Sequence, residues 1–224
     1  MGSVESSSYK KRSDNQRFID VGKEPDKILP PLPSISQLHS SASSLHEAVK
    51  PIHHLVEDLP YRVAYSLERC KNPKDGLTPD ESAAIFLYTQ QWPPEKTSFY
   101  TLFNRTLRDE NRAKLAPFHQ YFNLFMSVFN KLPSIQDRVW RGETGDWGDQ
   151  YKQGTVHVWW GVSSCTDMIH VTGDFLDQTK KRTLFNIKCI TGKIIKNHSE
   201  FPDESETVLP PGTYLKVKSS LKAT

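Results

Sequence analysis

The chain has 224 residues, a formal net charge of +3 and a pI near 8.6, and aromatic residues make up 11% of it. This length and the supply of aromatic side chains are sufficient for one substantial domain with an appendage. Nucleic-acid binding usually requires a concentrated basic face, and so mild a net charge excludes nucleic acid as an expected partner.

Three cysteines, Cys70, Cys165 and Cys189, follow no recognisable disulfide or zinc spacing, and no apolar secretory segment follows Met1. We therefore expect a reducing, cytoplasmic environment. The apolar clusters are too short and too mixed in character to span a bilayer.

The first six residues, Met-Gly-Ser-Val-Glu-Ser, fit the pattern for N-myristoylation at Gly2. A single acyl chain binds membranes only marginally, so an anchor would also need the basic cluster Lys10, Lys11 and Arg12. Peripheral membrane association is therefore an expectation, with a chance match as its alternative.

Residues 1–40 are rich in Ser, Lys, Asp and Pro, and they lack the apolar area to offset the entropy of ordering. We predict a mobile tail there, followed by an N-terminal helical region over residues 41–74, where apolar residues recur at steps of three and four and Pro60 interrupts the pattern. Residues 78–81 (Thr-Pro-Asp-Glu) predict a capped helix start. Two more helical stretches are expected around residues 98–108 and 112–131.

Four histidines fall on or beside these predicted helices without carboxylate or cysteine partners at metal-binding offsets: His46, His53, His54 and His119. We therefore expect no metal.

Strand-like sequence begins after residue 134. β-Branched and aromatic residues predict strands at 137–142, 155–162 and 182–190, and shorter ones at 193–195, 207–209 and 213–217. Helices followed by strands indicate an α+β fold and not the alternation of a doubly wound sheet.

The stretch 201–212 carries the candidate chemistry, because Glu204 and Glu206 lie two positions apart between a turn and a β-prone run. On an extended backbone their side chains would share one face, about 7 Å apart. One carboxylate could stabilise developing positive charge while the other orients or deprotonates a nucleophile. Taken alone, such a pair is usually solvated surface charge.

Two further motifs precede this pair, namely residues 139–142 (Val-Trp-Arg-Gly) and 161–166 (Gly-Val-Ser-Ser-Cys-Thr). Together with residues 199–213, they resemble the arginine–serine–glutamate group of mono-ADP-ribosyltransferases, which move ADP-ribose from NAD⁺ to a protein side chain. The likeness covers about residues 75–218. The departures from the family pattern are Cys165, Thr166 and Thr207.

This resemblance implies a split-sheet ADP-ribosyltransferase fold, with two small mixed β-sheets around an NAD⁺ cleft, as a catalytic domain over residues 75–220. It implies that Glu206 stabilises the oxocarbenium-like ribose, that Arg141 contacts the dinucleotide phosphates and that Ser164 holds glutamate and ribose in register. Gly142 would let the backbone approach the nicotinamide amide, and Phe175 would stack on the nicotinamide ring.

In this family the first glutamate of the pair, here Glu204, goes with arginine as the acceptor. A guanidinium has a pKa above 12 and must be oriented and helped to lose a proton. The resemblance also places Phe201 where relatives contact the target protein. We therefore expect a monomeric enzyme that consumes NAD⁺ as co-substrate and modifies an accessible arginine of a target protein.

The sequence has no Gly-x-Gly-x-x-Gly after a strand, which argues against a Rossmann-type dinucleotide site. Two alternatives to the transferase stay open. One is an NAD⁺ glycohydrolase with water as acceptor, and the other is a non-catalytic module that retains the cleft.

Overall fold

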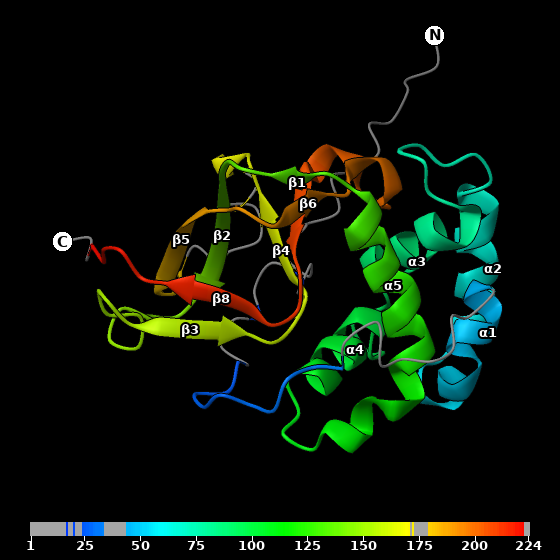
Figure 1. The fold of residues 1–224 in the computed structure, drawn as a ribbon, viewed down its shortest axis with the longest axis horizontal. Coiled ribbons are helices and arrows are strands. Elements are labelled where there is room, and N and C mark those ends of the chain that lie inside the picture. The colour runs from blue at the N-terminus through cyan, green and yellow to red at the C-terminus, as the bar shows by residue number, and fades with distance from the viewer. Residues whose placement is uncertain are drawn as a thin grey trace, which may run out of the picture.

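The computed structural model describes Arg17, Asp20, residues 24–33, residues 44–170, Thr172 and residues 179–221. Gly2, the basic residues 10–12 and Phe175 lie outside these residues. Figure 1 shows the helices gathered on one side of the molecule and the two β-sheets on the other. The predicted α+β class is therefore confirmed.

The helical layer contains five α-helices and two 3₁₀ helices over residues 45–131. The predicted interruption lies just before Pro60, at residues 56–58, and Pro60 itself stands in the first turn of the next helix, where a missing backbone N–H costs nothing. The elements are α1 (Leu45–Val49), η5 (Lys50–Leu55), α2 (Leu59–Arg69), α3 (Pro79–Thr89), α4 (Phe99–Leu107), η6 (Arg112–Phe118) and α5 (His119–Lys131).

Helix α3 lies at the centre of this layer and is buried from Glu81 to Thr89. It contacts α1, α2, α4 and α5, so it has no solvent-facing stripe. The predicted cap at its start is confirmed, because the Thr78 hydroxyl accepts from the Glu81 N–H and the Glu81 carboxylate accepts from the Thr78 N–H.

The larger sheet has six strands in the order β1-β6-β7-β4-β2-β5, and the smaller one pairs β3 with β8. All the pairings are antiparallel, in place of the mixed sheets that we expected. The strands are β1 (Ser134–Ile135), β2 (Arg138–Thr144), β3 (Val156–Trp159), β4 (Ser163–Thr166), β5 (Arg182–Lys188), β6 (Gly192–Ile194), β7 (Glu206–Leu209) and β8 (Thr213–Lys216). Two short 3₁₀ helices, η7 (Lys196–His198) and η8 (Pro202–Glu204), lie between β6 and β7.

The strand predicted over residues 155–162 is too long, because β3 ends at Trp159 and the chain then crosses to the other sheet, where β4 begins at Ser163. At the break, the N–H groups of Trp160 and Gly161 donate to the Glu24 carboxylate, at 2.7 and 3.3 Å, and not to a strand partner. Gly161 also admits the Arg108 guanidinium, since a Cβ there would lie only 2.5 Å from Nη2.

Two apolar clusters hold the layers together. One fills the helical layer and reaches the large sheet through Val162, Ile195 and Val208. The other lies between the two sheets and contains Val139 and Trp159. Among the residues that are described, no helix combines the length and the apolar character needed to cross a membrane.

The predicted mobile tail does not hold for Arg17, Asp20 and residues 24–33, which pack against the folded part of the chain. Arg17 and Asp20 are 0% and 3% exposed. In Figure 1 the blue segment 24–33 runs beneath β3 toward α4. Apolar content was the wrong criterion here, because ion pairs and hydrogen bonds order these residues.

His198 ties the segment before β7 to the helical layer. Its Nδ1 lies 2.9 Å from the Ser82 hydroxyl on α3, and its Nε2 lies 3.1 Å from the Asp75 carboxylate. The ring is 1% exposed, and burial lowers its pKa below the ordinary value of 6.5, despite the opposing effect of Asp75.

Replacement of Thr78 by Ala should lower the free energy of unfolding by about 1 kcal/mol, because the N–H of Glu81 loses its capping acceptor. Chemical denaturation should show a lower midpoint at an unchanged m-value. Thr78→Ser, which keeps the oxygen, is the control and should stay close to wild type.

Acidification should weaken the fold through His198. As the pH falls below about 6.5, the unfolded chain takes up a proton on this histidine before the folded chain does, so the free energy of unfolding decreases. The contribution is fully present above pH 7. In His198→Gln the decrease between pH 7 and pH 5 should be smaller.

His46→Gln, at an exposed position on α1, controls for the loss of a histidine as such. Equal pH dependence of the free energy of unfolding in wild type and in both variants would contradict the prediction.

Candidate active site

Three neighbouring strands bring the three sequence motifs together. Arg141 comes from β2, Ser164 from β4 and Glu206 from β7, and the sheet order places β4 between the other two. In the ladder, Thr166 of β4 pairs with both Trp140 of β2 and Glu206 of β7. Arg141, Ser164 and Glu206 are all 0% exposed. Antiparallel pairing therefore assembles residues that are far apart in the sequence at one place in the sheet.

The Arg141 guanidinium is held on several sides. Its Nη1 donates to the Ser164 carbonyl at 2.6 Å and to the Arg17 carbonyl at 2.8 Å. Its Nε donates to Glu143 at 3.1 Å, and its Nη2 forms an ion pair with Asp20. Burial disfavours the charged form, but the carboxylates of Glu143 and Asp20 outweigh it, so the pKa of Arg141 is raised above its ordinary value.

Glu204 and Glu206 do not share one face of an extended strand, contrary to our prediction. Glu204 ends the 3₁₀ helix η8, Ser205 has a left-handed backbone (φ 48°), and Glu206 begins β7. The Thr166 hydroxyl donates to the Glu204 carbonyl at 2.9 Å and fixes this turn against β4.

The two carboxylates nevertheless meet at one point. Nη2 of Arg17 lies 2.9 Å from Oε2 of Glu204 and 3.4 Å from Oε2 of Glu206. Both glutamates are buried, at 2% and 0% exposure. Burial weakens the charged form of Arg17, yet Glu206 and Glu204 raise its pKa above the ordinary value. The site therefore contains two buried acidic side chains that together bind one guanidinium.

Oγ of Ser164 and Oε1 of Glu206 are among the buried polar atoms at the site that have no hydrogen-bond partner within the described residues. An unsatisfied polar atom in the interior costs free energy, and such atoms mark places where a ligand completes the bonding. A hydroxyl-bearing ligand such as a ribose fits this pair, because a hydroxyl can donate to the carboxylate and bond to the serine.

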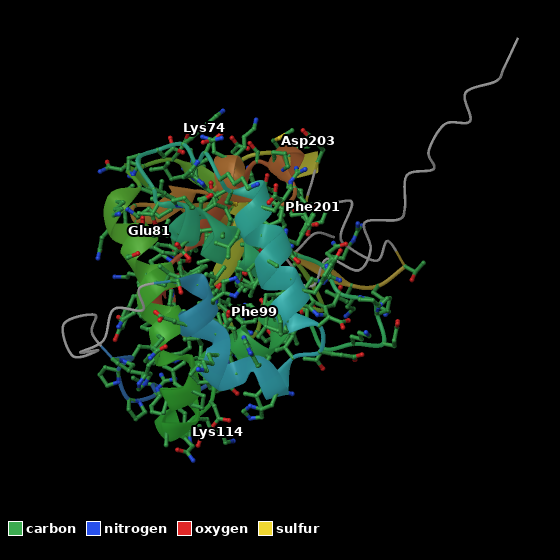
Figure 2. The ribbon with its side chains drawn as sticks, turned by 90° about the vertical axis from the view of Figure 1, so that its right-hand side faces the viewer. Lys74, Glu81, Phe99, Lys114, Phe201 and Asp203 are labelled. Atoms are coloured by element: carbon green, nitrogen blue, oxygen red, sulfur yellow. The ribbon has the colours of Figure 1, made fainter. Side chains whose placement is uncertain are left out.

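The remaining predicted residues have different surroundings. Gly142 is buried in β2, opposite Leu184 of β5. Phe201 is half-buried, and the Arg17 guanidinium lies over its ring, 5.4 Å from the centroid. Figure 2, which looks onto the helical layer, shows Phe201 near Asp203, at the end of the molecule where Lys74 lies. Phe175 cannot be placed.

Sequence reasoning missed several residues of the site. Glu143 could have been found, because it lies two positions after Arg141 on the same strand and so faces the same side. Arg108 on the C-cap of α4, and Arg17 and Asp20 in the supposed tail, gave no sequence signal. They reach the site only through the tertiary fold.

No group of three or more His, Cys, Asp or Glu side chains that could hold a metal lies in the described part of the chain. This finding does not test the reaction itself, so the expectation that the reaction uses no metal stays a prediction.

Comparison with solved structures supports the architecture. The Vis toxin, an ADP-ribosyltransferase from Vibrio splendidus, matches with a TM-score of 0.53 and 20% identity over 85% of this chain and 86% of that one. The type III effector XopAI from Xanthomonas axonopodis pv. citri matches with a TM-score of 0.58 and 19% identity over 82% of this chain and 78% of that one. The eucaryotic mono-ADP-ribosyltransferase ART2.2 matches with a TM-score of 0.52 and 22% identity over 75% and 73%. These likenesses show a shared fold.

No protein of curated function matches the sequence significantly. A family model described as NAD:arginine ADP-ribosyltransferase, however, matches residues 37–224. The match begins before α1, so it takes in helices that we had separated from the catalytic domain; the boundary at residue 75 stays a prediction. Because most of the chain matches this model, the protein belongs to the NAD:arginine ADP-ribosyltransferase family.

Proposed function

We propose that the protein transfers ADP-ribose from NAD⁺ to an arginine side chain of a target protein and releases nicotinamide. The observation that carries this proposal is the contact of one guanidinium nitrogen with two buried carboxylates, Glu204 and Glu206, at 2.9 and 3.4 Å. A site that holds a guanidinium beside a carboxylate oxygen and a hydroxyl without partners in the described part of the chain is suited to join an arginine to a sugar.

The proposed reaction breaks the bond between C1′ of the ribose and the nicotinamide nitrogen. The electron pair of that bond leaves with nicotinamide, and positive charge develops on the ribose. Glu206 stabilises this charge through the adjacent 2′-hydroxyl, because Oε1 can accept a hydrogen bond from that hydroxyl. Ser164 binds the same sugar through its Oγ, for which the described residues supply no partner, and fixes the orientation of the sugar. Both groups are buried, and the register of β4 with β7 puts them on one face of the sheet.

Glu204 serves the acceptor. It orients the incoming arginine so that a guanidinium nitrogen attacks C1′, and it takes the proton that this nitrogen loses as the new C–N bond forms. A guanidinium is a poor nucleophile while fully protonated, so a neighbouring carboxylate is needed for this step. In the structure Arg17 shows how a guanidinium meets Glu204.

Arg141 is suited to the pyrophosphate of NAD⁺. Its guanidinium is fixed by Ser164 and Glu143, and its Nη2 already binds an anion, the Asp20 carboxylate. A phosphate oxygen can take the place of that carboxylate, because both accept charge-assisted hydrogen bonds from arginine. Gly142, next to Arg141 on β2, would leave room for the nicotinamide amide, and Phe175 keeps its predicted stacking role.

Ligands of two related structures support both halves of the proposal. The Vis ADP-ribosyltransferase has been crystallised with agmatine, a compound with a guanidinium group. Exoenzyme S from Pseudomonas aeruginosa, which matches with a TM-score of 0.54 and 16% identity over 77% of this chain and 78% of that one, has been crystallised with carba-NAD and 14-3-3 protein. We propose the corresponding ligand classes for the present chain.

Glu206→Gln should reduce nicotinamide release from NAD⁺ by roughly 10²- to 10³-fold, because the amide carries no charge to stabilise the ribose cation. Release is measured with nicotinamide-labelled NAD⁺ in the presence of agmatine. Asp203→Asn, at an exposed position of the neighbouring η8, is the matched control and should retain wild-type turnover. Wild-type turnover in Glu206→Gln would contradict the proposal.

Glu204→Gln should separate transfer from hydrolysis. Incorporation of adenine-labelled ADP-ribose into agmatine or poly-arginine should fall by at least tenfold, while part of the nicotinamide release continues with water as the acceptor. If wild type releases nicotinamide but labels no arginine compound, the protein is instead an NAD⁺ glycohydrolase.

A further inference from the structure

The site is filled by the protein's own N-terminal segment. We call Arg17, Asp20 and residues 24–33 together the N-terminal strap. Arg17 is separated by 187 and 189 residues from Glu204 and Glu206, yet its guanidinium binds both carboxylates. Its Nη1 donates to the Thr89 carbonyl at the end of α3, and its guanidinium covers the Phe201 ring. The strap thus places a guanidinium where the proposed acceptor arginine must bind.

Asp20 occupies the second half of the site. Its carboxylate forms ion pairs with Nη2 of Arg141 and with Nη1 of Arg108, the latter at 2.7 Å. The side-chain amide of Asn104 lies 3.4 Å from Oδ2 of the same carboxylate. Asp20 therefore supplies negative charge to the arginine that we assign to the NAD⁺ phosphates.

Residues 24–33 anchor the strap next to the site. The Glu24 carboxylate accepts hydrogen bonds from Nε of Arg108, at 2.6 Å, and from the N–H groups of Trp160 and Gly161. Nε of Arg112 donates to the Pro30 carbonyl at 2.9 Å, and Leu29 packs with Val158 and Trp160. Arg108 binds both Asp20 and Glu24. This one side chain therefore connects the residue of the strap that pairs with Arg141 to the residues that hold the strap beside the site.

We propose that the N-terminal strap is a pseudosubstrate that keeps the enzyme closed: Arg17 replaces the acceptor arginine and Asp20 replaces a phosphate of NAD⁺. This inference rests on the proposed function for its ligands. It goes beyond that function, because it assigns the chain an inhibitory state that must open before either substrate enters.

A single segment that fills both subsites is a strong competitor. It is tethered to the site, so it acts at an effective concentration that a free ligand does not easily match. NAD⁺ binds only to the fraction of molecules in which the strap has left, and its apparent affinity falls by that fraction. The contacts are buried, so moderate salt screens them little. Opening requires the ion pairs of Arg17 with the two glutamates and those of Asp20 with Arg141 and Arg108 to break.

The test uses the protein of 224 residues and three variants: Arg17→Ala, Asp20→Asn and the double variant. Binding is measured calorimetrically with carba-NAD, which is not turned over, and turnover is measured as nicotinamide release from NAD⁺ with agmatine. Lys27→Ala is the matched control within the strap, because Lys27 is exposed and its ion pair with Glu110 lies at the surface. Unfolding midpoints show whether each variant is folded.

The double variant should bind carba-NAD at least tenfold more tightly than wild type and turn over NAD⁺ at least tenfold faster at subsaturating concentrations, whereas Lys27→Ala should match wild type. A synthetic peptide of residues 14–33 should inhibit the double variant competitively with NAD⁺. The same peptide with citrulline in place of Arg17 should inhibit at least tenfold less strongly. If one of the substitutions destabilises the protein, the difference in inhibition between the two peptides tests the strap proposal instead.

The possible results separate the two proposals. If the folded double variant binds carba-NAD with unchanged affinity, the proposal that the strap is a pseudosubstrate is wrong, whether or not the variant turns over NAD⁺. Tighter carba-NAD binding without any turnover supports the strap and overturns the proposed function. ADP-ribose found on Arg17 of the wild-type protein by mass spectrometry also overturns the strap as an inhibitor, because the segment would then be a substrate.

Discussion

The site depends on the neutralisation of one buried positive charge. Arg141 is 0% exposed, and a guanidinium in the interior is stable only when acceptors surround it. Glu143, the Ser164 carbonyl, the Arg17 carbonyl and Asp20 supply them. The two that come from the sheet keep Arg141 in place, whereas the two from the strap can be exchanged for the oxygens of a ligand.

The same reasoning applies to the acidic half of the site. Glu204 and Glu206 are buried and close to one another, so a cation between them relieves their repulsion. Arg17 is that cation in the closed protein, and an acceptor arginine or a ribose cation takes its place in the proposed reaction. A site made to stabilise positive charge thus attracts an internal guanidinium when no substrate is bound.

The break between β3 and β4 connects the two sheets to this charge network. The chain leaves the small sheet at Trp159 and enters the large one at Ser163, and the freed N–H groups of Trp160 and Gly161 bind Glu24 of the strap. The strap therefore completes hydrogen bonds of the scaffold as well as the ion pairs of the site. Departure of the strap would expose both sets to water or to a ligand.

The sequence by itself determined the order of helices and strands, the capped start of α3 and the three motifs, because turn chemistry, periodicity and motif spacing are local properties. Glu143 was within reach of the same reasoning. The tertiary structure alone decided that Glu204 and Glu206 converge from a 3₁₀ helix and a strand, through the left-handed Ser205. It also decided that Arg17 and Asp20 fill the site. Ion pairs across more than a hundred residues leave no periodic trace in the sequence, since only the folded sheet brings their charges together.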